Sequence, residues 1–439
     1  MLAKQNALFP FLYHEFFMTK QFSIPRGTAD IFPSEAGAWQ EIEAKARRIL
    51  ADYNYQEIRT PIFEETGLFR RSLGQTSEVV AKQLLELSSS GKEGFSLRPE
   101  GTAPVVRAYV EKSIDRQESL TKLFYIGPMF RGERPQKGRL RQFHQIGAEV
   151  IGPNTGNPYL DAEVIALNVN ILKAFGLQGF RLKINTLGSC EDKENFSNGL
   201  RQKLAAQRSR LCEDCQKRLE YNVFRILDCK NKECRAVIEH LHADYEHLSQ
   251  ESRDYYGRVK EALNALEIAF DEVPYLVRGL DYYTHTVFEI SDTSLGIQDA
   301  LSAGGRYNNL VSELGGPQAD AIGFALGMER VLLAMSSEPK PAASALTAYV
   351  IALDENVFPK AFHILNMLRG AGIPSDIDYK ISSLKSQMRS AHKAGSRYAV
   401  ILGEEENKRG VVALKDMATG NQREVGLTEL REILKKGKV

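Results

Sequence analysis

Two neighbouring β-strand patterns joined by a basic connection constrain the fold of this chain more than any other feature. Residues 121–131 and 141–151 have the pattern of strands, and the Gly- and Pro-containing residues between them are dense in Arg and Lys. Side chains on a strand alternate between two faces. One face is then mainly apolar, and the other is a polar floor that carries Phe143, Gln145, Gly147 and Glu149. Along that floor Gln145 and Glu149 would lie roughly 13 Å apart, which suits a small bound molecule.

The basic connection contains one arginine in a setting unlike the others. Arg131 stands at a strand end beside bulky apolar residues, so we expect it to be buried with an anionic partner. Lys137 and Arg139 are expected to be solvated. The planar fork of arginine matches a phosphate with two parallel hydrogen bonds, so this segment is a candidate phosphate site.

Residues 321–335 change from a strand pattern to a helix pattern near Gly327. This places Arg330 in the first helical turn, where the helix dipole disfavours a cation by roughly 0.3 to 1 kcal/mol. Two explanations remain open: a salt bridge to Glu329 or another carboxylate, or a bound triphosphate.

The chain is too long for one compact core, which predicts two or three domains. Folded-domain signals begin near residue 24, so residues 1–17 are interpreted as an N-terminal extension. Residues 18–336 form the main domain, interrupted by a charged helical insertion at 190–265. A Pro- and Ala-containing linker at 337–346 precedes a small α/β domain at 347–439.

Near the start of the main domain, one amphipathic helix is expected. Ser34 is its candidate N-cap, and the apolar positions recur at spacings of three and four: Trp39, Ile42, Ala46 and Ile49.

Charge and cysteine content limit the environment of the chain. Lys plus Arg (57) almost equals Asp plus Glu (56), so no overall cationic bias indicates a nucleic-acid partner. The apolar stretch at 7–18 is too short to span a bilayer and does not have the pattern of a secretory signal. An odd number of clustered cysteines fits a reducing, cytoplasmic setting without disulfides.

Four of the five cysteines form two pairs. Cys212 and Cys215 are followed by Cys229 and Cys234, a count and spacing compatible with a tetrahedral structural zinc site. Four reduced cysteines in a helical insertion are the equally weighted alternative.

Several segments together resemble a known family. Residues 130–145 and 321–331 resemble motifs 2 and 3 of the class II aminoacyl-tRNA synthetases. Residues 278–283 (Arg-Gly-Leu-Asp-Tyr-Tyr) and 303–307 (Ala-Gly-Gly-Arg-Tyr) resemble the two signature segments of the histidyl-tRNA synthetases. Residues 98–102 and 25–30 also match, and all of these motifs follow the family order over more than 300 residues.

The resemblance implies an α+β fold, with a class II antiparallel sheet, flanking helices, a helical insertion and a C-terminal anticodon-binding domain. It implies that residues 18–336 form the catalytic domain. It also implies a histidine pocket lined by Glu100, Gly101, Thr102, Gln145, Glu149, Tyr282 and Tyr283, with Glu149 and Tyr283 contacting the imidazole.

By the same resemblance, Arg131 and Arg330 would hold the ATP phosphates, and Arg278 would bridge the histidine carboxylate and the α-phosphate. Mg²⁺ would accompany ATP. The enzyme would convert L-histidine and ATP to histidyl-adenylate and pyrophosphate, then transfer histidine to the 3′ end of tRNA(His). A carboxylate nucleophile is already ionised at neutral pH, so positioning and charge stabilisation suffice and no general base is needed.

Other consequences rest on the resemblance as well. A homodimer is expected across the helix that carries Trp39 and Ile42, with a core-facing helix as the equal alternative. Two departures from the family pattern touch the support of the pocket: Asn308 stands where Asp is usual, and residues 76–87 lack the usual run. We expect altered packing there and retained activity.

Two other functions are compatible with some of these motifs. A synthetase-like regulatory subunit of ATP phosphoribosyltransferase would bind histidine as a sensor, but it would have little use for Arg131, Arg278 and Arg330 or for an RNA-binding C-terminal domain. A synthetase for another amino acid would share motifs 2 and 3, but not the two histidine-specific segments.

Overall fold

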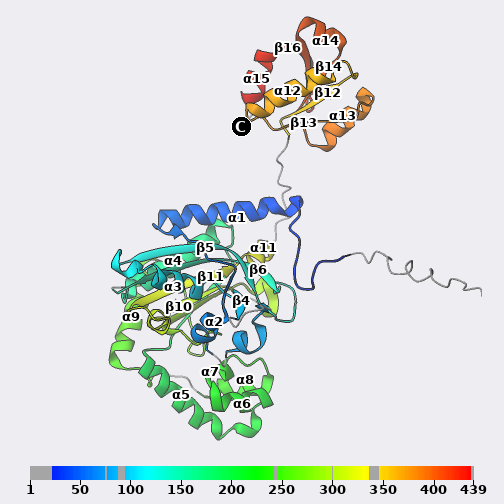
Figure 1. Cartoon of the computed structure of the whole chain (residues 1–439). Coiled ribbons are helices and arrows are strands. Elements are labelled where there is room, and N and C mark those ends of the chain that lie inside the picture. The colour runs from blue at the N-terminus through cyan, green and yellow to red at the C-terminus, as the bar shows by residue number, and fades with distance from the viewer. Residues whose placement is uncertain are drawn as a thin grey trace, which may run out of the picture. The chain divides into compact units, whose positions relative to one another are not determined.

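The structure is a computed structural model that describes residues 22–74, 77–87, 94–153, 155–241, 245–298, 300–335 and 346–436. Its contacts divide the chain into two compact units, residues 1–338 and 339–439 (Figure 1). The predicted extension at 1–17 and the predicted linker, apart from Leu346, lie outside the described residues.

A largely antiparallel sheet forms the centre of the first unit, in the order β1-β5-β6-β11-β10-β9-β7-β8. The predicted hairpin is confirmed as β5 and β6, which pair antiparallel from Phe130 opposite Gln142 to Thr121 opposite Ile151. Only the short edge strands β1 and β8 pair in parallel. The strands are β1 (Gln56–Glu57), β5 (Thr121–Phe130), β6 (Gln142–Gly152), β7 (Arg181–Thr186), β8 (Asp271–Glu272), β9 (Thr284–Ser291), β10 (Ala300–Arg306) and β11 (Asp320–Gly327).

One face of this sheet is buried under helices. Ile146, Ala148 and Val150 of β6 join the main apolar core there, as their alternation predicted. Asn157 caps α4, because its side chain accepts a hydrogen bond from the backbone of Tyr159. The covering helices are α1 (Pro33–Asp52), α4 (Pro158–Ala174), α9 (Gln250–Ala265) and α11 (Met328–Ala334) (Figure 1).

The opposite face is covered only in part, by a second core and a small three-stranded sheet in the order β2-β4-β3. The uncovered part of this face, over β6, β10 and β11, holds the cavity described below. The elements on this side are β2 (Phe63–Glu65), α2 (Thr66–Ser72), the π-helix at Val79–Gln83, β3 (Glu86–Leu87), β4 (Phe95–Leu97), α3 (Thr102–Glu111) and α10 (Leu310–Glu313).

Helix α1 differs from its prediction at the N-terminus. The helix begins at Pro33 with Phe32 as N-cap, so the prediction of Ser34 as the cap is wrong. Proline suits the first helical position because its missing N–H would have had no helical partner. Ile42 is fully buried in the core of its own chain, so the interface interpretation is wrong for Ile42. Trp39 is half-buried and packs edge-on against His144 at 4.9 Å.

The region predicted as a helical insertion divides between two cores. α5 (Cys190–Ala205), α6 (Glu213–Tyr221), α7 (Phe224–Leu227) and α8 (Lys232–Glu239) enclose a small core of their own. In contrast, α9 contributes Tyr256, Val259 and Leu263 to the main core. The prediction of helices is confirmed across this region. However, α9 packs its apolar face against α4 and so belongs to the main body of the first unit.

The second unit is a small α/β fold, as predicted. Its sheet runs β13-β12-β14-β15-β16, with β12 parallel to both of its neighbours and the last two pairings antiparallel. Apolar clusters cover both faces. The elements are β12 (Ala348–Ala352), α12 (Phe358–Gly370), β13 (Ser375–Ile377), α13 (Leu384–Lys393), β14 (Tyr398–Leu402), α14 (Glu404–Arg409), β15 (Val411–Asp416), β16 (Gln422–Gly426) and α15 (Leu427–Lys436).

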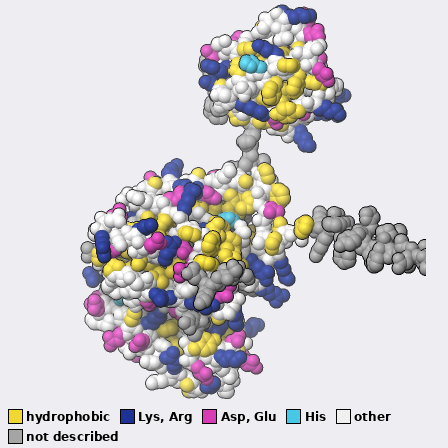
Figure 2. All heavy atoms as spheres, in the orientation of Figure 1, with side chains coloured by type: hydrophobic (Ala, Val, Ile, Leu, Met, Phe, Trp, Pro, Cys, Tyr) yellow, Lys and Arg dark blue, Asp and Glu magenta, His cyan; other side chains and the backbone are white. Residues whose placement is uncertain are grey.

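The surface shows no dominant charge. Figure 2 shows Lys and Arg side chains interspersed with Asp and Glu over the visible face, in keeping with the near-equal counts of the two signs. Within the described residues, none of the helices combines the length and the apolar character that crossing a bilayer requires.

Candidate active site

A cavity lies on the partly open face of the main sheet, over the polar floor of β6. It brings together residues from five separate parts of the chain: the start of α3, the β5–β6 hairpin, the segment before β9, β10 with the following Tyr307, and the junction of β11 with α11. Of the predicted site residues, those that line it are Glu100, Thr102, Arg131, Gln145, Arg278, Tyr282, Tyr283 and Arg330. Gly101 and Glu149 are the two that do not.

Glu149 is buried and touches two residues that do line the cavity. Its Oε1 accepts a hydrogen bond from Thr102 Oγ1 at 2.7 Å, and its Oε2 accepts one from the Tyr307 hydroxyl at 2.5 Å. Burial raises the pKa of Glu149 from 4.5 to about 8, against the lowering effect of these two hydrogen bonds. In the ligand-free chain, burial therefore favours the protonated form of this carboxyl group.

Gly101 leaves room for a tyrosine ring. A Cβ at Gly101 would lie 2.2 Å from Cζ of Tyr125, and a Cβ at Gly147 would lie equally close to the same atom. The ring of Tyr125 thus fits between two glycines and lines the cavity, a role that the sequence analysis missed. Gly101 acts here as a spacer, with no side chain to offer a ligand.

Three buried polar atoms of cavity-lining residues have no hydrogen-bond partner in the described part of the chain. They are the hydroxyl of Tyr125, Oε1 of Gln145 and Nε of Arg278. Buried polar groups in proteins are nearly always paired, and leaving one unpaired costs about 1 to 3 kcal/mol. Their convergence on one cavity indicates a site built for a polar ligand.

Arg131 is half-buried, but the expected anionic partner is not found among the described residues. Its Nε donates to the carbonyl of Pro99 at 2.9 Å, and its guanidinium lies 5.2 Å from the ring centre of Phe143. Burial lowers the pKa of Arg131. Within the described residues a backbone carbonyl and an aromatic face hold Arg131, so its anionic partner stays a prediction.

Arg330 is also held by backbone carbonyls. Its Nε donates to Gly138 at 3.1 Å and its Nη1 donates to Ala300 at 2.7 Å. Glu329 instead accepts from the backbone N–H of His144 at 2.9 Å, so the predicted Glu329 salt bridge is wrong. In the described ranges no carboxylate lies within 4 Å of Arg330, and burial lowers its pKa.

The remaining charged side chains of the cavity have protein partners. Arg278 pairs with Glu289 of β9 at 2.6 Å. Arg139 pairs with Glu133 at 3.2 Å and lines the cavity, so its predicted solvation is wrong, whereas Lys137 is exposed as expected. Arg139 is less exposed than Lys137 because its side chain pairs with Glu133.

Glu100 is committed to the helix that follows it. Its carboxylate accepts hydrogen bonds from the backbone N–H groups of Thr102 at 2.7 Å and Ala103 at 2.9 Å, at the N-terminus of α3. These donors have no partner inside a helix, so Glu100 anchors the start of α3. Burial raises the pKa of Glu100.

A fully buried ion pair supports the cavity wall. Arg306 and Asp161 lie 2.6 Å apart with both side chains inaccessible to solvent, and Thr286 donates to the same carboxylate at 2.6 Å. Asn308 accepts hydrogen bonds from the backbone of Ala321 at 3.2 Å and from Arg306 at 3.4 Å. Asn308 is therefore a packing and hydrogen-bonding residue behind the cavity.

Sequence reasoning missed Tyr307 and the Arg306–Asp161 pair as parts of the site. Arg306 and Tyr307 belong to the segment 303–307, which resembles a signature of the family. That resemblance could have indicated both residues as candidates for the site. Their contacts with Glu149 and Asp161 join residues more than 140 positions apart, which no local pattern encodes.

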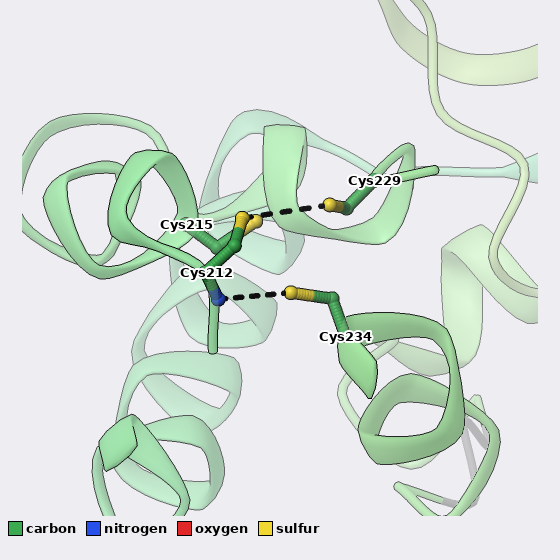
Figure 3. A group of neighbouring side chains, drawn as sticks. All are labelled: Cys212, Cys215, Cys229 and Cys234. Atoms are coloured by element: carbon green, nitrogen blue, oxygen red, sulfur yellow. Dashed lines mark hydrogen bonds between the residues drawn. The ribbon is translucent and has the colours of Figure 1, made fainter. Parts of the chain in front are cut away.

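The four clustered cysteines come together in the first unit. Figure 3 shows the side chains of Cys212, Cys215, Cys229 and Cys234 turned toward one another, and their sulfur atoms all lie within 4.8 Å of each other. This geometry is compatible with a bound metal ion. Cys190 lies elsewhere and is exposed.

Comparison with known proteins gives one consistent picture. A family model described as histidyl-tRNA synthetase matches residues 27–331, and one described as anticodon binding domain matches residues 347–437. The histidine–tRNA ligase of Halothermothrix orenii is 47% identical over 414 residues, covering 94% of this chain and 98% of the relative. That of a Geobacillus species is 45% identical over 419 residues, covering 94% and 99%.

A solved structure agrees with these relatives. The apo histidyl-tRNA synthetase of S. aureus superposes with a TM-score of 0.78 at 36% identity, over 94% of this chain and 100% of that one.

Proposed function

Since the chain belongs to the histidyl-tRNA synthetase family, we propose that its cavity activates histidine with ATP and then transfers histidine to tRNA. The chain is thus an ATP-dependent histidine–tRNA ligase. One observation carries the site assignment: Arg131, Arg278 and Arg330 share a single cavity beside the buried Glu149–Tyr307 pair.

In the first step, the histidine carboxylate attacks the α-phosphorus of ATP and pyrophosphate leaves from the opposite side. Arg131 and Arg330 hold the phosphates; both are already fixed by carbonyls through Nε, which leaves other guanidinium N–H groups for phosphate oxygens. Arg278 bridges the carboxylate and the α-phosphate. Mg²⁺, which class II enzymes use with ATP, neutralises phosphate charge.

No side chain needs to remove a proton in this step. The nucleophile is ionised at neutral pH, so the residues act by orienting the two reactants and by stabilising the charge that spreads over the phosphate oxygens. In the second step, the 3′-terminal hydroxyl of tRNA(His) attacks the carbonyl of the adenylate, AMP leaves, and the hydroxyl proton is released.

The imidazole ring is recognised at the other end of the cavity. Tyr283 lines the wall there, and Glu149 acts on the ring through Tyr307 and Thr102, which it holds by hydrogen bonds. The unpaired Gln145 and Tyr125 atoms offer further polar contacts to the amino acid. A site with fixed polar partners rejects amino acids that lack them by large factors.

Family membership supports a proposal for the domain roles, the location and the assembly. Residues 18–336 are the catalytic domain and residues 347–439 bind the tRNA anticodon. The enzyme works in the cytoplasm as a homodimer, with the half-buried Trp39 of α1 as a candidate contact. Light scattering of the purified full chain tests the assembly, and a mass of one chain, about 49 kDa, would contradict it.

Histidine-dependent ATP–pyrophosphate exchange tests the proposed activity. All amino acids are compared with the wild-type chain, and Arg278→Ala is measured beside it with Arg181→Ala, an exposed arginine on β7, as the matched control. We expect histidine to be the best substrate and only Arg278→Ala to lose exchange. A histidine-sensing subunit would show no exchange, and a synthetase of other specificity would prefer another amino acid.

A further inference from the structure

The four clustered cysteines form a compact arrangement of ligands from three successive elements. Cys212 immediately precedes α6, Cys215 lies within α6, Cys229 follows α7, and Cys234 lies in α8 (Figure 3). We propose that their thiolates bind one structural Zn²⁺ ion, and that this ion fixes the neighbouring segment 277–283 that supplies Arg278, Tyr282 and Tyr283 to the cavity.

The distances suit a tetrahedral metal site. Zinc–thiolate bonds are about 2.3 Å long, so two sulfur ligands at tetrahedral angles lie about 3.8 Å apart. Sγ of Cys212 and Sγ of Cys229 lie 3.9 Å apart, and all four sulfur atoms fall within 4.8 Å of one another. Only small side-chain adjustments separate this arrangement from full coordination.

Two polar groups of the chain also lie at the cluster. The backbone N–H of Cys212 donates to Sγ of Cys234 at 3.2 Å, a contact that stabilises a negatively charged sulfur. Arg218 lies beside Cys215 and supplies a cation. Cys212 and Cys229 are half-exposed, so simple burial of apolar side chains does not account for all four positions.

The insertion needs such a cross-link because its own elements are short. α6, α7 and α8 contain nine, four and eight residues, each below the roughly 12 to 15 that an isolated helix needs for even marginal stability. Their shared apolar core is small. A metal joining all three elements replaces the stability that a larger core would give.

The same elements hold the cavity segment in place. The Asn222 side chain, at the end of α6, donates to Asp281 Oδ1 at 3.0 Å. Arg225 of α7 packs against Gly279, where an added Cβ would lie 3.2 Å from its Nη1. Val277 contacts both the core of the insertion and the second core of the main body. Loosening α6 and α7 would therefore release the residues on either side of Arg278.

Metal analysis of the purified full chain tests the zinc site directly. We expect about one zinc per chain, and nearly none in the double variant Cys212→Ser/Cys229→Ser. Cys190→Ser is the matched control and keeps its zinc, since Cys190 lies outside the cluster. Replacement of zinc by Co²⁺ should give the intense charge-transfer absorption of thiolate coordination in the wild type and in Cys190→Ser, but not in the double variant.

Several results would overturn the zinc site. They are absence of zinc after reconstitution with Zn²⁺, retention of zinc by the double variant, or thiol titration showing that the four cysteines are disulfide-bonded in the isolated protein.

The link to the cavity rests on the proposed function and has its own test. Asn222→Ala removes the hydrogen bond to Asp281 and leaves the cysteines intact, so zinc content should stay at the wild-type value while kcat/KM for histidine in the exchange reaction falls roughly tenfold. Unchanged exchange kinetics would refute the link. Zinc content is measured independently of activity. A chain that binds zinc but does not use histidine would therefore contradict the proposed function and leave the zinc site standing.

Discussion

Arg330 occupies a position that a cation ordinarily avoids. It is the third residue of α11, near the positive end of the helix dipole, and burial lowers its pKa. Two backbone carbonyls hold its guanidinium, and Glu329 is engaged with His144. These conditions support the proposal that Arg330 binds an anion from outside the chain, the triphosphate of ATP.

Arg330→Ala should therefore weaken the use of ATP. Hydrogen bonds to charged groups contribute about 1.5 to 3 kcal/mol, so kcat/KM for ATP should fall by roughly 10- to 100-fold while the KM for histidine changes little. Pyrophosphate exchange at varied ATP and at varied histidine separates the two effects. Lys137→Ala removes an exposed cation from the β5–β6 connection that does not line the cavity; it is the control and should behave like wild type. An equal loss for both substrates would contradict a role at the phosphates.

The buried carboxyl group of Glu149 makes the stability of the folded chain depend on pH. Its folded-state pKa of about 8 lies above the ordinary value of 4.5, so the folded protein binds a proton that the unfolded chain releases in this interval. The stability that this group contributes is fully present below pH 4.5 and is lost as the pH rises through 8. Burial is the cause, because it makes ionisation of this carboxyl group unfavourable.

Glu149→Gln should remove this dependence. The difference in melting temperature between the wild type and the variant should shift in favour of the variant as the pH is raised from 5 to 8.5, because glutamine does not ionise. Thermal melts of both ligand-free proteins across that range measure it. A difference that stays constant with pH would show that Glu149 does not titrate as its burial requires.

At the scale of elements, strand periodicity was the most informative signal. The two strand patterns predicted the pairing of β5 with β6. Alternation over 141–151 also assigned Ile146, Ala148 and Val150 to the core, because every second residue of a strand with one buried face is apolar. The strand-to-helix change at Gly327 was predicted for the same reason, as β11 ends there and α11 begins.

The failures have two physical origins. The core that receives α9 depends on contacts between distant parts of the chain, whereas the cap of α1 and the Arg139–Glu133 pair form between residues close in the sequence, where more than one local arrangement was open. Local pattern gives the type of an element and its apolar face. It does not give the element that the face meets, nor whether a carbonyl or a carboxylate will receive a guanidinium.

The pairing of β6 with β11 depends on a glycine. Gly323 lies opposite Glu149, and a Cβ there would lie 1.7 Å from Oε2 of Glu149 and 2.6 Å from the carbonyl oxygen of Ala148. Neither the buried carboxyl nor the backbone of β6 has free space to move into. Strand β11 can therefore pair closely with β6 at Glu149 only because Gly323 has no side chain.

Gly323→Ala should displace Glu149 and strain the sheet. Overpacking a core costs about 1 to 3 kcal/mol, so the free energy of unfolding should fall by that amount and histidine-dependent exchange should be largely lost. Urea unfolding and the exchange assay measure the two effects. Gly426→Ala, at a strand glycine with no atom within 4 Å of the added Cβ, should be neutral or slightly stabilising. Equal behaviour of the two variants would refute the matched packing.

At the scale of the whole molecule, the proposed function assigns amino-acid activation to the first unit and anticodon binding to the second. Every residue that lines the cavity falls between positions 100 and 330, within the first unit. The second unit has apolar clusters on both faces of its own sheet, so its stability does not depend on the first. Amino-acid activation and tRNA selection should then be separable.

A chain that ends at residue 345 should keep histidine-dependent exchange at the wild-type rate, because it retains the complete cavity. Its kcat/KM for tRNA(His) should fall by roughly 100-fold or more, since losing an interface worth about 3 kcal/mol produces a change of that size. Aminoacylation at varied tRNA concentration, measured beside exchange on the same preparation, separates the two activities. Melting of the shortened chain confirms that it is folded. If exchange falls in parallel with aminoacylation in a folded preparation, the second unit is needed for amino-acid activation. The two activities would then not be separable.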